Sequence, residues 1–232
     1  MKVTIIHGQA HKGSTYHISE MIKNKLIDNE SVVDEYFMPK DAPQYCVGCY
    51  NCMNKGEEFC PHEKEVQLIA KSMENADVII VDSPTYCFEM TGQLKTLFDH
   101  LAYMWMPHRP RKNMFEKVAI VISTAAGSGA NKVTKSLKQQ LFWMGVPIIY
   151  QLNQNVNAAS WERVPSKIRI VLDKKIEDIV KKTIRKISKS KPPIKLKVVF
   201  HIMGMMQKSN NGNMTDKSYW MRNGWLNGKH PW

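Results

Sequence analysis

Five short runs rich in β-branched and other apolar residues alternate with helical patterns, and this alternation restricts the fold more than any other feature. The runs cover residues 2–8, 31–38, 77–84, 117–124 and 146–153. The segments with helical patterns cover residues 14–28, 62–76, 91–105 and 131–145. Parallel strands need crossover connections, and helices usually provide them. The sequence therefore predicts an α/β fold in which a five-stranded parallel sheet has helices on both faces.

The chain continues beyond the last strand into a basic region. Residues 166–187 have an apolar residue or a threonine every three or four positions, which predicts a long amphipathic helix with lysines on its outer face. The last forty residues look irregular and are rich in Met, Trp and Lys. We therefore predict a domain over residues 1–190, with a cysteine-rich insertion at 43–62, and a basic, helical C-terminal extension over 191–232.

The positive charge of the chain is confined to this C-terminal part. The net charge is +12, yet residues 1–160 contain 16 Lys and Arg against 16 Asp and Glu, whereas residues 161–232 contain 17 against 5. Because the lysines lie on the outer face of an amphipathic helix, we interpret them as a solvated surface and expect neither a nucleic acid nor a membrane as partner. The first residues turn polar too soon for a signal peptide, so we expect a cytoplasmic protein.

The loop after the first strand has the sequence GQAHKGST over residues 8–15. Its glycines have the spacing of a Walker A loop, but Ser14 stands where that motif needs lysine, which argues against an ATP or GTP motor. Backbone N–H groups and hydroxyls at the start of a helix suit a phosphate monoester. The alternative is an ordinary turn that Ser14 caps. The candidate phosphate ligands are Gln9, His11, Lys12, Ser14 and Thr15.

Two further loops follow the third and fourth strands, and parallel sheets bind ligands at this edge. Residues 83–95 offer aromatic and polar groups suited to a flat heteroaromatic ring, although Tyr86 and Phe88 could instead be core residues. Residues 123–130 are small and would let a ligand approach the backbone, but they lack the last glycine of a dinucleotide fingerprint.

Four of the five cysteines lie within fifteen residues and have the spacing C-x2-C-x2-C-x7-C. They are Cys46, Cys49, Cys52 and Cys60. Two consecutive C-x2-C steps are typical of ferredoxin-type clusters, and Pro61 after the last cysteine is a weaker sign of the same kind. Zinc sites more often separate two such steps by a longer arm, so zinc is a weaker alternative than a cluster, and unmetallated reduced thiols are the other alternative. Disulfides are not expected in a reducing compartment.

The order of the loops GQAHKGST, SPTYCFEMTGQLKTLFDHL and STAAGSG resembles the flavodoxin-like, NAD(P)H-dependent FMN reductase superfamily over roughly residues 1–155. This resemblance implies a three-layer sandwich with strand order 2-1-3-4-5. It implies that the FMN phosphate is bound by Gln9, His11, Lys12, Ser14 and Thr15. It places one edge of the flavin against Pro84, Thr85, Tyr86, Cys87 and Phe88. It places another edge against Thr124, Ala125, Ala126 and Gly127. Gln9 and His11 stand where serine and arginine are usual in the family.

The cysteine segment follows the second strand and is similar in its position to that of the iron-sulfur flavoproteins of this superfamily. The resemblance implies a candidate [4Fe-4S] cluster on Cys46, Cys49, Cys52 and Cys60, beside the ligand edge of the sheet. We expect an FMN-dependent oxidoreductase that takes hydride from NAD(P)H and reduces a small acceptor such as a quinone, nitro compound or flavin. No side chain is expected to be catalytic, because FMN carries the chemistry. The alternative is an electron-transfer protein with a ferredoxin-like partner, and a homodimer is expected in either case.

Overall fold

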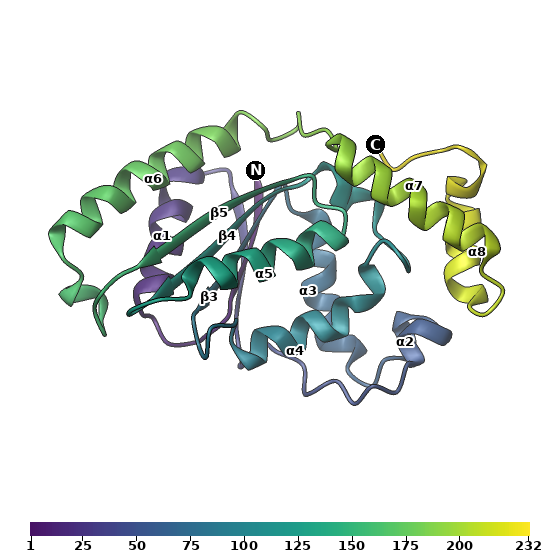
Figure 1. The fold of residues 1–232 in the computed structure, drawn as a ribbon, viewed down its shortest axis with the longest axis horizontal. Helices are drawn as coiled ribbons and strands as arrows, with labels where there is room; N and C mark the ends of the chain where they lie inside the picture. Colours follow the sequence, from purple (N-terminus) through teal and green to yellow (C-terminus); the bar gives the residue numbers. More distant parts are fainter.

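The centre of the computed structural model, which describes residues 1–232, is a five-stranded sheet (Figure 1). Its strands are β1 (Lys2–His7), β2 (Val32–Phe37), β3 (Val78–Pro84), β4 (Val118–Ala125) and β5 (Ile148–Asn155). They are all parallel and lie in the order β2-β1-β3-β4-β5. The predicted fold class and strand order are therefore confirmed.

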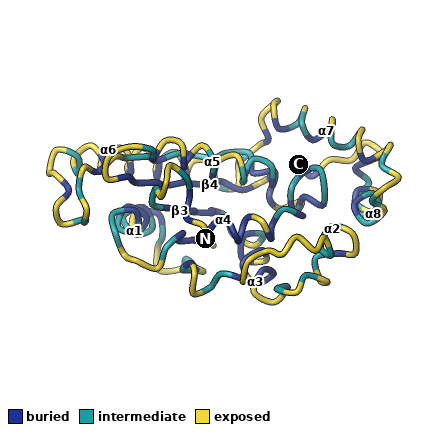
Figure 2. The backbone as a smooth tube through the Cα atoms, turned by 60° about the horizontal axis from the view of Figure 1, so that its bottom comes forward, coloured by how far each residue is buried: buried dark blue, intermediate teal, exposed yellow.

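Helices cover both faces of the sheet. One face carries α1 (Ser14–Leu26) and α6 (Ser166–Ile184), whose apolar sides pack on alternate residues of the strands. The opposite face carries α3 (Glu63–Asn75), α4 (Gly92–His100) and α5 (Ala130–Trp143). Strand β4 is buried along its whole length and β3 is buried up to Pro84, as expected for apolar strands enclosed by two helical layers (Figure 2).

The C-terminal residues are more regular than the sequence suggested. The predicted helical C-terminal extension is confirmed, although its sequence looked irregular, because α7 (Ile194–Ser209) and α8 (Met214–Arg222) account for most of it. These helices have their own small core, in which Phe200 and Trp220 stack at a ring separation of 4.7 Å. The core also includes Met106 and Phe115 of the main domain, so the extension packs against the body of the protein.

Short helical elements complete the structure. They are α2 (Asn51–Asn54), η1 (Glu57–Phe59), η2 (Leu101–Met104), η3 (Lys112–Glu116), η4 (Trp161–Arg163) and η5 (Trp225–Asn227). The helix predicted over residues 91–105 thus ends at His100 and continues as the 3-10 turn η2. No helix in the structure combines the length and the apolar character that a membrane crossing requires.

Candidate functional site

A cleft opens at the carboxyl edge of the sheet, between the loops that follow β1, β3, β4 and β5. Most of the predicted flavin ligands line it: Gln9, His11, Ser14, Thr15, Pro84, Thr85, Tyr86, Thr124, Ala125 and Ala126. The predicted residues that do not line it are Lys12, Cys87, Phe88 and Gly127. The lining residues that sequence reasoning missed are Gly13, Tyr16, Asp82, Val156, Ala158 and Ala159. The last three follow β5, and their position after a parallel strand was the signal that could have identified them.

The loop after β1 presents free amide donors to this cleft. Helix α1 begins at Ser14 without a side-chain cap, so the N–H groups of Ser14, Thr15 and Tyr16 have no acceptor within the chain. The loop is held close to β3, because the N–H of Gly8 donates to the carbonyl of Asp82 at 2.7 Å. A Cβ on Gly8 would lie 2.8 Å from that carbonyl oxygen, so no larger residue fits. An anion is the acceptor that suits these amides and the positive end of the helix dipole.

The loop after β3 ends in a tight turn that exposes aromatic rings. Tyr86 and Glu89 exchange backbone hydrogen bonds at 3.0 and 2.9 Å, and the two residues between them have positive φ angles of 51° and 63°. These angles are those of a type I′ turn, which is costly for residues other than glycine and asparagine. The turn leaves Tyr86 at the cleft with about half of its surface exposed, as a flat surface for a planar ligand.

The loop after β4 is hydrogen-bonded to the start of α1 and to the loop after β3. The Oγ1 atoms of Thr124 and Thr15 lie 2.6 Å apart, and the N–H of Thr85 donates to the carbonyl of Thr124 at 2.9 Å. Gly129 has a φ of +103°, and a Cβ there would lie 2.9 Å from the side chains of Thr85 and Phe88. Glycine thus allows the second and third loops to pack together, which fixes the width of the cleft between them.

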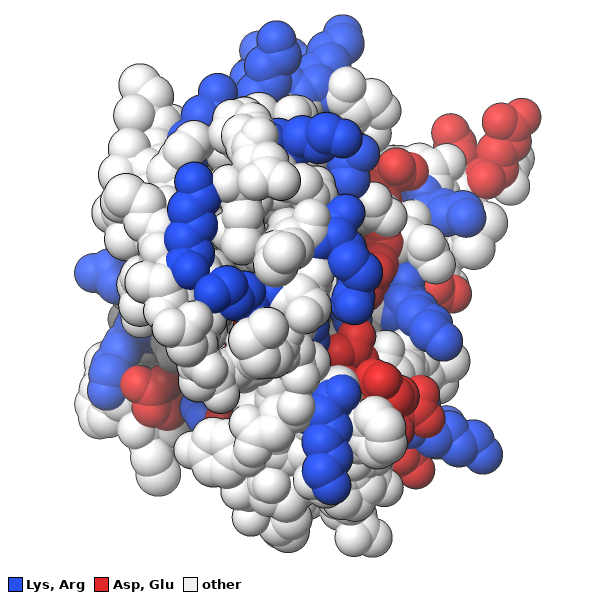
Figure 3. Space-filling view, turned by 90° about the vertical axis from the view of Figure 1, so that its right-hand side faces the viewer, with Lys and Arg blue, Asp and Glu red and all other residues white.

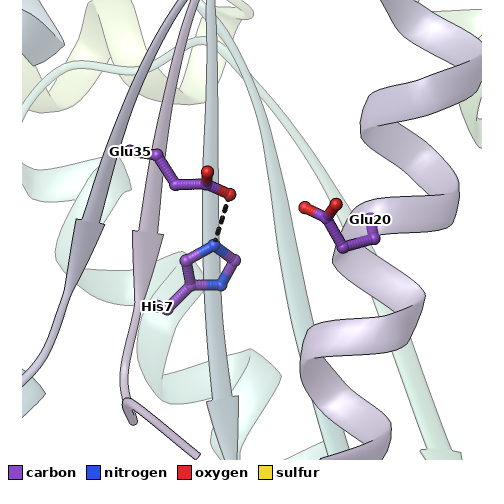
Figure 4. A group of neighbouring side chains, drawn as sticks. All are labelled: His7, Glu20 and Glu35. Carbon is purple, nitrogen blue, oxygen red and sulfur yellow. Dashed lines mark hydrogen bonds and ion pairs between the residues drawn. The ribbon is translucent and has the colours of Figure 1, made fainter. Parts of the chain in front are cut away.

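Beneath the cleft lies a buried charge network that the sequence did not suggest (Figure 4). The fully buried His7 has its Nδ1 atom 2.5 Å from Asp82 and its Nε2 atom 2.9 Å from Glu35. Burial alone would lower the pKa of His7, but the hydrogen bonds and charges of the two carboxylates outweigh it and raise the pKa above its ordinary value. We therefore assign His7 as an imidazolium that donates one N–H to each carboxylate.

The same network resembles a metal site in its composition. One ligand atom each of His7, Glu20 and Glu35 lies within 4.8 Å of the others. However, both nitrogens of His7 are engaged, and the ammonium of Lys23 forms ion pairs with both glutamates. The cations of the protein thus already neutralise these carboxylates, so the group is an ion network and not a metal site.

The four clustered cysteines form a second candidate site, away from the cleft. Cys46 and Cys49 are exposed, whereas Cys52 and Cys60 are partly buried. Burial raises the pKa of Cys52 and of Cys60, and in both cases the negative charge of neighbouring cysteines raises it further. This mutual repulsion means that the thiol groups converge on one region. His100, which sequence reasoning missed, has its Nδ1 atom 3.6 Å from the sulfur of Cys60.

None of the four clustered cysteines lines the cleft. Helix α4 separates the two sites. At its start the hydroxyl of Thr91 donates to the carbonyl of Gly8 in the phosphate loop, and at its end His100 contacts Cys60. Eight residues of helix between Gly92 and His100 rise about 12 Å. The chain between β2 and α2 therefore runs toward α8, and α2, which contains Cys52, lies near α8 (Figure 1).

Sequence relatives of the chain are flavoproteins. An iron-sulfur flavoprotein of Archaeoglobus fulgidus is 25% identical over 159 residues, which are 67% of this chain and 70% of that protein. An iron-sulfur flavoprotein of Clostridioides difficile is 28% identical over 194 residues, 78% of this chain and 81% of that protein.

Solved structures share the fold at lower identity. An azoreductase from Bacillus anthracis has a TM-score of 0.60 at 14% identity, and the match covers 79% of this chain and 98% of that one. A flavoenzyme NAD(P)H:(acceptor) oxidoreductase from Paracoccus denitrificans has a TM-score of 0.51 at 18% identity, covering 80% and 98%. Residues 1–159 match the NADPH-dependent FMN reductase family, so the whole sheet lies within the matched part. The chain therefore belongs to the NADPH-dependent FMN reductase family.

Proposed function

We propose that the protein is an FMN-dependent oxidoreductase that takes hydride from NAD(P)H and passes electrons to a small acceptor such as a quinone, nitro compound or flavin. The observation that carries the proposal is the cleft, which combines free amide donors at the start of α1 with an exposed aromatic ring. Family membership supports the same cofactor. FMN, when bound, supplies the ability to accept a hydride and to release electrons singly or in pairs.

The residues of the chain would bind and orient this cofactor. The amides of Ser14, Thr15 and Tyr16 would bind the phosphate, and the hydroxyl of Thr15 is already fixed by Thr124. Tyr86 would lie against the ring, and the backbone at Ala125 and Ala126 would lie close to another edge. Lys12 does not line the cleft, but its ammonium lies 5.0 Å from the ring centre of Tyr16, which does, so we assign Lys12 a supporting electrostatic role.

A second candidate function is favoured by the cysteine site. In this alternative the protein is an iron-sulfur flavoprotein that exchanges electrons with a ferredoxin-like partner, and relatives with that name support it. The donor set fits a cluster better than a single zinc ion. The spacing C-x2-C-x2-C is typical of ferredoxin-type clusters, whereas structural zinc sites more often separate two C-x2-C steps by a longer arm. A cluster held by Cys46, Cys49, Cys52 and Cys60 would supply one-electron transfer.

The visible spectrum of protein purified without oxygen tests both proposals. We expect the absorption bands of oxidised flavin, which NADH or NADPH should bleach in a stopped-flow experiment. A broad additional absorption that dithionite bleaches, together with iron and sulfide in the protein, would favour the cluster. Colourless protein that does not bind added FMN would overturn the proposed function. Light scattering would test the expected homodimer.

A further inference from the structure

The short helix that carries Cys52 has its C-terminal carbonyls bound by distant parts of the chain. The guanidinium of Arg109 donates to the carbonyl of Cys52 and, at 3.4 Å, to that of Met53. The side-chain amide of Asn213 also donates to Met53, at 3.2 Å, and the hydroxyl of Thr215 donates to Asn54 at 2.6 Å. The last carbonyls of any helix lack partners within the helix, and here side chains from outside provide them.

Arg109 is held in place by the C-terminal extension. Its guanidinium forms an ion pair with Asp216, and the side chains of both residues are almost fully buried. Asp216 also accepts hydrogen bonds from His108 at 2.7 Å and from Asn213 at 2.9 Å. A buried ion pair contributes little net stability, but the loss of one partner is costly because it leaves the other charge unpaired. Glu57 also pairs with this guanidinium, 3.2 Å from its Nε atom, so Asp216 and Glu57 together fix where the guanidinium points.

Other contacts anchor α8 independently of the cysteine segment. The indole N–H of Trp220 donates to the carbonyl of His108 at 2.6 Å, and the hydroxyl of Tyr219 donates to that of Pro110 at 2.7 Å. Trp220 is fully buried in the C-terminal core. Figure 3 shows the end of the molecule where these helices lie, with basic side chains spread over it and acidic ones gathered at one side. The extension is thus a rigid support on which a contact to the cysteine segment can be built.

We propose that Arg109, Asn213, Thr215 and Asp216, which we call the clasp, are positioning residues for the four-cysteine site, and that the C-terminal extension is part of that site. The clasp fixes the backbone that carries Cys52 relative to the other three cysteines. The role as a cluster site rests on the proposed function. The ordering of residues 51–56 by the clasp does not rest on the proposed function, because every contact is made by the protein itself.

Amide hydrogen exchange in the metal-free, reduced protein tests the clasp directly. The amides of Lys55 and Gly56 donate to the carbonyl of Asn51 and report the integrity of α2. We expect their exchange to rise at least about tenfold in Asp216→Asn, which loses a charge-assisted hydrogen bond, and about threefold in Thr215→Val, which loses a neutral one. The matched control is Lys217→Ala, in the same helix, whose ammonium contacts only Asn211.

The cofactors provide a second measurement. After reconstitution, we expect Asp216→Asn and Thr215→Val to lose iron to a chelator faster than the wild type and to show a shifted cluster reduction potential, while FMN affinity stays unchanged. If Asp216→Asn also lost FMN affinity, that variant would be generally disordered. The result for Thr215→Val would then decide whether the clasp positions the cysteine segment. Exchange and iron loss equal to those of Lys217→Ala in both variants would overturn the proposal. Protein without cluster absorption would contradict the proposed iron-sulfur cluster, but the hydrogen-exchange result would still test whether the clasp orders residues 51–56.

Discussion

The charge network under the cleft predicts that the stability of the protein depends on pH through His7. We consider His7→Gln, which is neutral and has both of its N–H donors on one nitrogen, whereas the imidazolium has one N–H on each of two separate ring nitrogens. In the wild type, His7 bonds Asp82, which is almost fully buried, and Glu35, which is about a quarter exposed. The variant can bond one of these carboxylates but not both, and it supplies no positive charge.

The size of the effect follows from these contacts. A hydrogen bond to a charged group is worth about 1.5–3 kcal/mol, and the bond to Glu35 counts for less because solvent reaches it. We expect His7→Gln to lower the free energy of unfolding by about 3 kcal/mol at pH 6. Because folding raises the pKa of His7 above its ordinary 6.5, this stabilisation is fully present below pH 6.5 and is lost as the pH rises through the higher folded-state pKa.

Urea unfolding followed by circular dichroism, without added flavin, measures this dependence between pH 5.5 and about pH 9. We expect the difference between wild type and His7→Gln to shrink to about 1 kcal/mol at the alkaline end. The control is His17→Gln, because His17 stacks on Trp161 and forms no ion pair with a carboxylate within 4 Å. A difference that stays constant across this range would refute the assignment of His7 as an imidazolium.

Three further predictions concern the two candidate sites. Thr15→Val should weaken FMN binding about tenfold, because it removes a hydroxyl at the proposed phosphate site. An unchanged FMN affinity in a fluorescence titration would argue against phosphate binding at the start of α1. Phe88→Gly should raise the unfolding free energy by about 0.5–1 kcal/mol in thermal denaturation, since glycine relieves the positive φ at a modest entropic cost. Lower stability would contradict that account. Cys52→Ser should abolish iron binding and cluster absorption but keep FMN, whereas Cys87→Ser should keep both.

The sheet was predictable because its strands are short apolar runs separated by clear helical periods, and such patterns depend only on local sequence. Helix α7 was not predictable in this way. Leu196 and Phe200 on one side of it are buried, but Ile194 and Val198 on the other side are also apolar and exposed. A helix that is apolar all round has little periodicity, so the segment looked irregular.

The cleft was predictable only in part. The loops after β1, β3 and β4 carry hydroxyls, glycines or aromatic rings that suggest a ligand, whereas the small apolar residues at 156–159 do not. The pairing of His7 with Asp82 joins residues 75 positions apart, and the contact of Asn213 with Met53 joins residues 160 positions apart. Nothing in the local pattern indicates such partners, because they are set by how the strands and helices come together.

The wide separation of the clasp from the cysteines also orders events during synthesis. Asn213 is made 160 residues after Met53, so at bacterial or eukaryotic translation rates it leaves the ribosome on the order of ten seconds later. During this interval Arg109 is already present, but Asn213, Thr215 and Asp216 are not. The nascent chain therefore presents its thiols before the C-terminal members of the clasp can bind the carbonyls of Met53 and Asn54.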